Sequence, residues 1–99
     1  MSTDKERLLK IIRAGKGAEN ADFRWADLTG MQLKFANLKG INLENANLTK
    51  VNLIGADLTG AKLKGAFFNN TDMGGTILED IDPTGVDFGD SFYASRYFR

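Results

Sequence analysis

One short period runs through most of this chain and restricts its fold more than any other feature. From Ala21 to Asp90 a five-residue pattern recurs without insertion or deletion, so these 70 residues divide into fourteen units. Leucine, phenylalanine or methionine stands at the third place of every unit except one, where Pro83 replaces it. Two places earlier the residue is usually small or β-branched, most often alanine. Such a fixed period is typical of a repeat architecture.

A period of five matches neither the 3.6-residue turn of a helix nor the two-residue alternation of a strand. It fits a square coil, in which each unit makes one side and four units close one turn. The third residue and the one two places before it then point inward, because side chains of extended backbone alternate. Glycine is common at the fifth place, where a corner needs unusual backbone angles. The repeats would make about 3.5 coils, joined by parallel backbone hydrogen bonds.

Stacking the units by twenties predicts four columns of apolar side chains inside the coil. The columns are Phe23, Leu43, Leu63 and Pro83; Leu28, Leu48, Phe68 and Phe88; Leu33, Leu53 and Met73; and Leu38, Leu58 and Leu78. Each buried leucine contributes roughly 1.5–3 kcal/mol relative to exposure. A core built this way leaves no room for a substrate pocket. Proline cannot donate to a ladder and suits an edge near the end of the repeats.

Units such as ADLTG, ANLKG, ANLTK and AKLKG resemble the pentapeptide repeat family, whose pattern is A(D/N)LxX. The resemblance covers residues 21–90 and is strongest from Ala21 to Ala66. It implies an all-β solenoid, specifically a right-handed quadrilateral parallel β-helix. Some members of the family protect DNA gyrase from quinolones by resembling B-form DNA, and several dimerise through their C-terminal ends. Those DNA mimics are longer and strongly acidic.

Residues 1–20 do not follow the repeat and predict an amphipathic helix of about three turns. Thr3 or Ser2 can cap it, with acids in its first turn, where negative charge is favourable. Gly15 and Gly17 end it. Its apolar face consists of Leu8, Leu9, Ile11 and Ile12. Because so short a helix is unstable alone, we expect it to cap the open end of the repeat stack.

The composition excludes several kinds of function. The 13 basic residues balance 13 acidic ones, so no net charge attracts nucleic acid or a membrane surface. Cysteine and histidine are absent, which removes the commonest metal ligands, thiolate chemistry and the usual general base. We therefore expect a non-enzymatic protein without cofactor or metal. The first residues show no apolar run, so we expect no secretory signal and a cytoplasmic location.

Short polar residues precede the third place in most units and could be mistaken for catalytic carboxylates. Because they follow the period, we expect them to bond neighbouring backbone amides in turns. The series is Asp22, Asp27, Asn37, Asn42, Asn47, Asn52, Asp57, Asp72, Asp82 and Asp87.

An acidic patch is predicted towards the end of the repeats, where no base interrupts six acids. It consists of Asp72, Glu79, Asp80, Asp82, Asp87 and Asp90. A solvated acidic surface explains it most simply. Calcium binding and imitation of nucleic-acid phosphates are the alternatives. The spacing of calcium-binding repeats is absent, and the zero net charge opposes mimicry.

Five bulky apolar residues fall at outward or corner places: Trp25, Phe35, Ile54, Phe67 and Ile77. The twenty-residue stacking puts them on different sides, so it predicts no single patch. Trp25 and Phe35 lie near the first coil, and we expect them to pack against the N-terminal helix. A binding role is the alternative.

The last nine residues, 91–99, form an aromatic tail in which the repeat fades. Its aromatic residues are Phe92, Tyr93, Tyr97 and Phe98. The last coil would otherwise leave its bore and edges open. The tail therefore predicts either an intramolecular lid or a homodimer interface, which the resemblance also favours.

These features together predict a non-catalytic module that presents a rigid β-helical surface to a protein partner. The partner is not identified by the sequence, and neither direct nucleic-acid binding nor membrane binding is expected. The alternative function is a DNA-mimic modulator or protector of gyrase or topoisomerase. Fold alone decides little between these functions.

Overall fold

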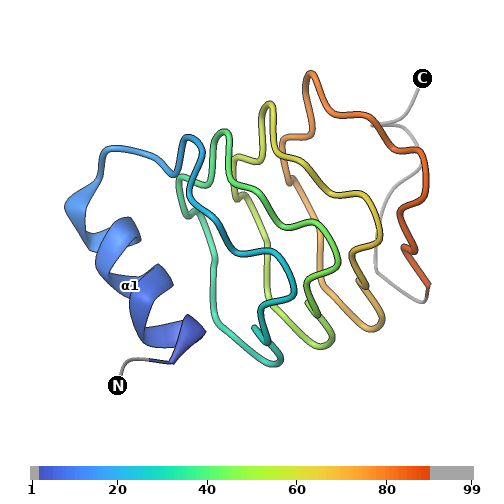
Figure 1. The fold of residues 1–99 in the computed structure, drawn as a ribbon, viewed down its shortest axis with the longest axis horizontal. Helices are drawn as coiled ribbons and strands as arrows, with labels where there is room; N and C mark the ends of the chain where they lie inside the picture. Colours follow the sequence, from blue (N-terminus) through green and yellow to red (C-terminus); the bar gives the residue numbers. More distant parts are fainter. Residues whose placement is uncertain (1–2, 90–99) are drawn as a thin grey trace.

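The structure, a computed structural model, describes residues 3–89 of the chain. Helix α1, Asp4–Ala14, lies at one end, and the coils follow one another away from it along the long axis (Figure 1). The molecule measures 38 × 22 × 21 Å, so its cross-section is nearly square. The fold is a solenoid, as the period predicts.

Parallel backbone bridges join the coils at the predicted register. All nine bridges among the described residues connect residues twenty apart, for example Asp22 with Asn42 and Asn42 with Lys62. A side contributes at most a single bridge residue, and the side that contains Asp82 contributes none, so within residues 3–89 no side is long enough to count as a strand. Four sides of five residues therefore make one coil.

A tight turn separates each side from the next. The Ala26 N–H donates to the Phe23 carbonyl at 3.1 Å, and the same bond recurs around the coils. The fifth residue of each described unit has φ between 56° and 76°, whether it is glycine or not. A positive φ at this place is the requirement of a type II turn. The predicted corner role of the fifth place is confirmed.

The core consists of the two inward places of each unit, as predicted. Leu28, Leu48 and Leu58 at the third place are fully buried, and so are Ala46 and Ala56 two places before it. The narrow bore explains why the second inward place favours alanine, since a side chain there lies close to the corner.

Two threonines replace alanine in this bore without leaving a polar group unpaired. The Thr71 hydroxyl donates to the Leu48 carbonyl at 2.6 Å, and the Thr76 hydroxyl donates to the Leu53 carbonyl at 2.7 Å. Both side chains are fully buried. Because a buried hydroxyl without a partner is costly, these bonds are what allow threonine in the core.

The prediction that Pro83 completes a core column is wrong, because this residue is exposed. The preceding members of its column, Phe23, Leu43 and Leu63, are buried. A pyrrolidine ring is too short to fill the bore as leucine does, so of the two inward places on this side of the fourth coil only Ile81, which is half-buried, packs against the core.

Helix α1 has the capping residues that its sequence predicts. The Thr3 side chain accepts a hydrogen bond from the Glu6 N–H at 3.1 Å, and Gly15 ends the helix with φ 72°. Leu8 is fully buried, and Leu9, Ile11 and Ile12 pack against the core while half-buried. The helix therefore lays its apolar face on the first coil.

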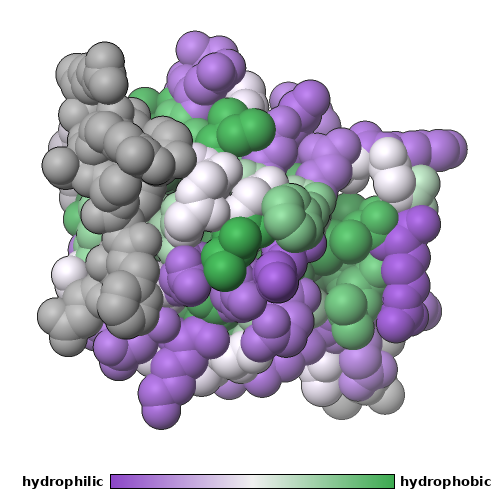
Figure 2. Space-filling view, turned by 180° about the vertical axis from the view of Figure 1, so that it is seen from behind, coloured by the Kyte–Doolittle hydropathy of each residue, from purple (hydrophilic) through white to green (hydrophobic). Residues whose placement is uncertain are grey.

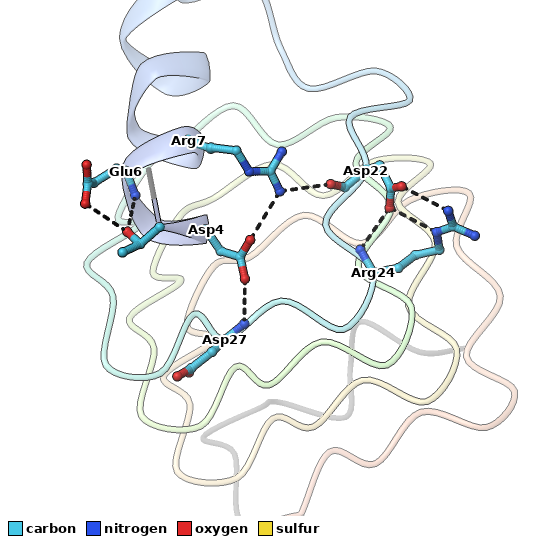
Figure 3. A network of polar contacts seen from close by, with 7 residues as sticks. Asp4, Glu6, Arg7, Asp22, Arg24 and Asp27 are labelled. Atoms are coloured by element: carbon cyan, nitrogen blue, oxygen red, sulfur yellow. Dashed lines mark hydrogen bonds and ion pairs between the residues drawn. The ribbon is translucent and has the colours of Figure 1, made fainter. Parts of the chain in front are cut away.

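Polar side chains of α1 also bond the open backbone edge of that coil. Asp4 accepts from the Asp27 N–H at 3.3 Å, and Arg7 donates to the Asp22 carbonyl at 3.2 Å (Figure 3). These are the groups that a preceding coil would have bonded. The Arg7 guanidinium also lies 4.3 Å from the centre of the Phe23 ring. The helix thus satisfies both the apolar and the polar requirements of the edge.

Candidate functional site

The acidic residues predicted as a patch lie on several sides of the third and fourth coils rather than along one face. Asp72 pairs with Asn52 on one side, and Asp87 pairs with Phe67 on another. Glu79 and Asp80 form a turn, and Asp82 lies on the side that follows it. Asp90 lies outside the described residues. The structure therefore brings Asp80 and Asp82 together, whereas Asp72 and Asp87 belong to different sides.

The polar residue before the third place bonds its own turn, as predicted. In each of the ten, the side-chain oxygen accepts a hydrogen bond from the backbone N–H two residues later, as Asp72 does from Gly74 at 3.1 Å. Asn52 in addition donates to Gln32 in the preceding coil at 3.2 Å. This local role explains the whole series without catalysis.

These turn bonds also explain the charge state of the carboxylates. The Arg24 guanidinium, aided by the Arg24 N–H, lowers the pKa of Asp22 to about 2. Hydrogen bonds from Thr29 and Thr84 lower the pKa values of Asp27 and Asp82. Each shift favours the ionised form, so these groups stay charged and are poorly suited to accept a proton near neutral pH.

The prediction that Trp25 and Phe35 pack on the helix is wrong. Their side chains are 76% and 73% exposed. Both occupy the fifth place, where the left-handed turn directs the side chain outward from the corner. Ten residues separate them, which is half a coil, so they lie at opposite corners.

The other bulky outward residues are less exposed, Phe67 at 47% and Ile77 at 40%. Apolar surface on the face opposite that of Figure 1 is broken into separate patches by hydrophilic groups (Figure 2). The Phe35 ring lies against the backbone of Gly55, where a Cβ would clash with it. Glycine at 55 therefore leaves space for the Phe35 ring and also suits the φ of 67°.

The aromatic residues predicted as a lid or an interface, Phe92, Tyr93, Tyr97 and Phe98, lie outside the described residues. Among the residues that the structure does describe, no group of three or more acidic side chains is placed to hold a metal ion. Within the same part of the chain, no helix has the length and apolar character needed to cross a membrane.

A cleft that the sequence analysis did not predict opens between the third and fourth coils. It has a volume of about 330 Å³ and is lined by Glu44, Gly60, Ala61, Lys62, Leu63, Lys64, Asp80, Asp82 and Thr84. It lies where the side containing Pro83 bows away from Leu63. The proline at a leucine place was the signal in the sequence that could have indicated it.

Comparison with known proteins agrees with the coil geometry. The family model of pentapeptide repeats matches in eight copies over residues 18–45, 26–65 and 41–80. These matches span more than half of the chain, which therefore belongs to the pentapeptide repeat family. No curated protein matches the sequence.

Two similar solved structures are pentapeptide repeat proteins from the cyanobacterium Nostoc PCC 7120. The protein alr5209 is 24% identical with a TM-score of 0.42, over 97% of this chain and 92% of that one. HetL, which is involved in regulating heterocyst differentiation, is 24% identical with a TM-score of 0.29. That match covers 76% of this chain and 41% of HetL, so the chain matches less than half the length of HetL.

Proposed function

We propose that this protein is a non-catalytic module that presents a rigid β-helical surface to a protein partner. Members of the pentapeptide repeat family are typically non-enzymatic. We further infer that about 3.5 coils wind as a right-handed quadrilateral β-helix with α1 as its N-terminal cap. The inward residues form the core, and the polar residue before the third place forms hydrogen bonds within the turn. The residues at the outward places are therefore the ones available to contact a protein partner.

The observation that carries the proposal is the pair of exposed aromatic residues at left-handed turn positions. Trp25 has φ 63° and Phe35 has φ 58°. Glycine suits these angles best and occupies half of the fourteen fifth places, so a bulky aromatic residue there is unfavourable for the backbone. With about three quarters of each side chain exposed, burial does not offset that cost. Exposed aromatic residues of this kind are typical anchors of protein interfaces.

Glycine substitution tests this role without weakening the turn. Trp25→Gly with Phe35→Gly relieves the left-handed strain, so the variant is expected to fold at least as well as the parent. Asn45→Gly with Lys50→Gly is the matched control, since both residues occupy the same place with φ 61°. In a pull-down from the native cell, the aromatic variant should lose a partner that the parent and the control retain. Equal recovery of every partner by all three proteins would contradict the proposal.

A homodimer through the C-terminal end is a second part of the proposal. The last coil needs a cover for its bore, and aromatic residues with arginine are common at interfaces. Light scattering should give twice the monomer mass, and Phe92→Ser with Tyr97→Ser should reduce it to the monomer. A protein that remains monomeric at high concentration would exclude this interface.

The DNA-mimic alternative receives little support from the charge distribution. A mimic needs a continuous negative face along the coils, whereas Asp72, Asp82 and Asp87 lie on different sides of the third and fourth coils. Bases interrupt the surface of the same region, since Lys62 and Lys64 also lie on the third coil. In a gyrase supercoiling assay at micromolar protein, we expect neither inhibition nor protection.

A further inference from the structure

The cleft between the third and fourth coils exposes one missing step of the backbone ladder. On the same side one coil earlier, the Leu43 N–H donates to the Lys62 carbonyl at 2.8 Å, and the Lys62 N–H donates to the Ile41 carbonyl at 2.9 Å. The corresponding bonds of Leu63 and Ala61 with Asp82 are absent, and within residues 3–89 neither the Leu63 N–H nor the Ala61 carbonyl has another partner.

The ladder is in register before this gap and shifted by one residue after it. The Gly60 N–H donates to the Glu79 carbonyl at 2.9 Å, whereas the Gly65 N–H donates to the Gly85 carbonyl at 2.9 Å instead of to that of Thr84. Segment 80–84 therefore bows out between two bonded points. A long peptide cannot pass through such a slot, because its ends are closed. The cleft volume of about 330 Å³ is in the range of small-molecule sites.

Charges of both signs surround the two unpaired backbone groups. Lys62 and Lys64 line the cleft on the third coil and form no ion pair with any described residue. Glu44, Asp80 and Asp82 supply carboxylates to the same lining. An anion alone would meet the carboxylates unfavourably, and a cation alone would meet the lysines. A ligand that carries both charges is the one that this lining complements.

We propose that this cleft binds a free α-amino acid as its zwitterion. The missing ladder step is one N–Cα–C=O unit, and an α-amino acid supplies that unit with a charge at each end. Its ammonium group would donate to the Ala61 carbonyl on the side of Asp80, which lines the cleft next to Gly60 and Ala61. Its carboxylate would accept from the Leu63 N–H between Lys62 and Lys64. The side chain would face solvent or the apolar rim, so the site selects the main-chain group.

The test is a titration of the ¹⁵N-labelled full chain with glycine and L-alanine at millimolar concentration, followed by amide chemical shifts. We expect saturable shifts at Leu63 and Lys64. N-acetyl-alanine and alanine methyl ester each lack one charge, so they should bind about tenfold more weakly, as expected for losing a charged hydrogen bond. No shift with either amino acid, or equal affinity for the blocked forms, would overturn the proposal.

Two variants exclude a non-specific effect. Lys64→Met should weaken binding about tenfold. Lys34→Met is the matched control, since Lys34 holds the same place in its unit and does not line the cleft, and it should leave the affinity unchanged. Equal losses in the two variants, or none with Lys64→Met, would contradict the site. Amide exchange without ligand gives a separate check: if Leu63 exchanges as slowly as Leu43, Asp82 closes the cleft and the proposal fails.

Discussion

The open backbone edges at the two ends of the described solenoid differ in how they are hydrogen-bonded and covered. At the N-terminal end, Asp4 and Arg7 of α1 take the place of a coil and bond Asp27 and Asp22. Towards the other end, the side that holds Pro83 leaves Leu63 without its ladder partner. The first edge combines apolar burial with hydrogen bonds, whereas at the second only the half-buried Ile81 packs against the core and the exposed Pro83 leaves the third place of the unit unfilled. The comparison indicates that hydrophobic anchoring decides whether the ladder forms.

The largest effect is expected from removing the anchor of α1. Leu8→Ala should lower the free energy of unfolding by about 2–5 kcal/mol, because it removes a fully buried side chain and leaves a cavity. Urea denaturation measures this loss. Ile81→Ala, at a half-buried residue of the bowed side, is the comparison and should cost clearly less. Equal losses at the two positions would show that the ends do not differ in anchoring.

The second prediction gives the bowed side a buried apolar side chain like the one that Leu8 supplies at the N-terminal end. Pro83→Leu should fill the column below Leu63 and stabilise the protein by roughly 1.5–3 kcal/mol. The Leu63 amide should then exchange as slowly as that of Leu43. Pro83→Ser is the control, since it removes the ring without adding an apolar side chain. If the leucine and serine variants have the same stability and the same exchange rate at the Leu63 amide, the outward bend of segment 80–84 is not caused by the missing apolar side chain at position 83.

A smaller effect is expected from the helix cap. Thr3→Ala removes the acceptor of the Glu6 N–H and should cost about 1 kcal/mol of stability. Thermal unfolding monitored by circular dichroism measures the change. Thr3→Ser keeps the oxygen and should stay close to the parent. A serine variant as unstable as the alanine variant would argue against the capping bond.

The smallest expected effect is the change in stability at acidic pH that the Asp22 carboxyl group causes. The pKa of Asp22 lies at about 2 instead of its ordinary 3.8, chiefly because of Arg24. A carboxyl group with a lowered pKa stabilises the folded state above pH 3.8 and loses this contribution as the pH falls towards 2. The difference in melting temperature between the parent and Asp22→Asn should therefore shrink over this range. Because the pair is exposed, salt should reduce the difference. A constant difference would show that Arg24 does not act through the charge.

Much of the fold could be predicted from residues that repeat. Leu28 and Leu48 are buried and Asn47 bonds its turn because each acts through neighbours at a fixed spacing. The bounds of α1 follow from Thr3 and Gly15 for the same local reason. The outward placement of Trp25 and Phe35 was predicted correctly, whereas their packing against the helix was predicted wrongly, since the direction of a corner side chain depends on the sign of φ.

The sequence by itself determined the twenty-residue register, the inward columns, the turn bonds and the helix, because these depend on local spacing and on burial repeated many times. Tertiary structure alone decided how Asp4 and Arg7 replace a missing coil, and that the side of Pro83 bows out to open a cleft beside Leu63. Those outcomes depend on which groups meet across coils once the repeat is interrupted. A periodic pattern predicts contacts between residues at the same place in successive coils. It predicts nothing about the structure where one of these residues is replaced by a residue of another kind, as at Pro83.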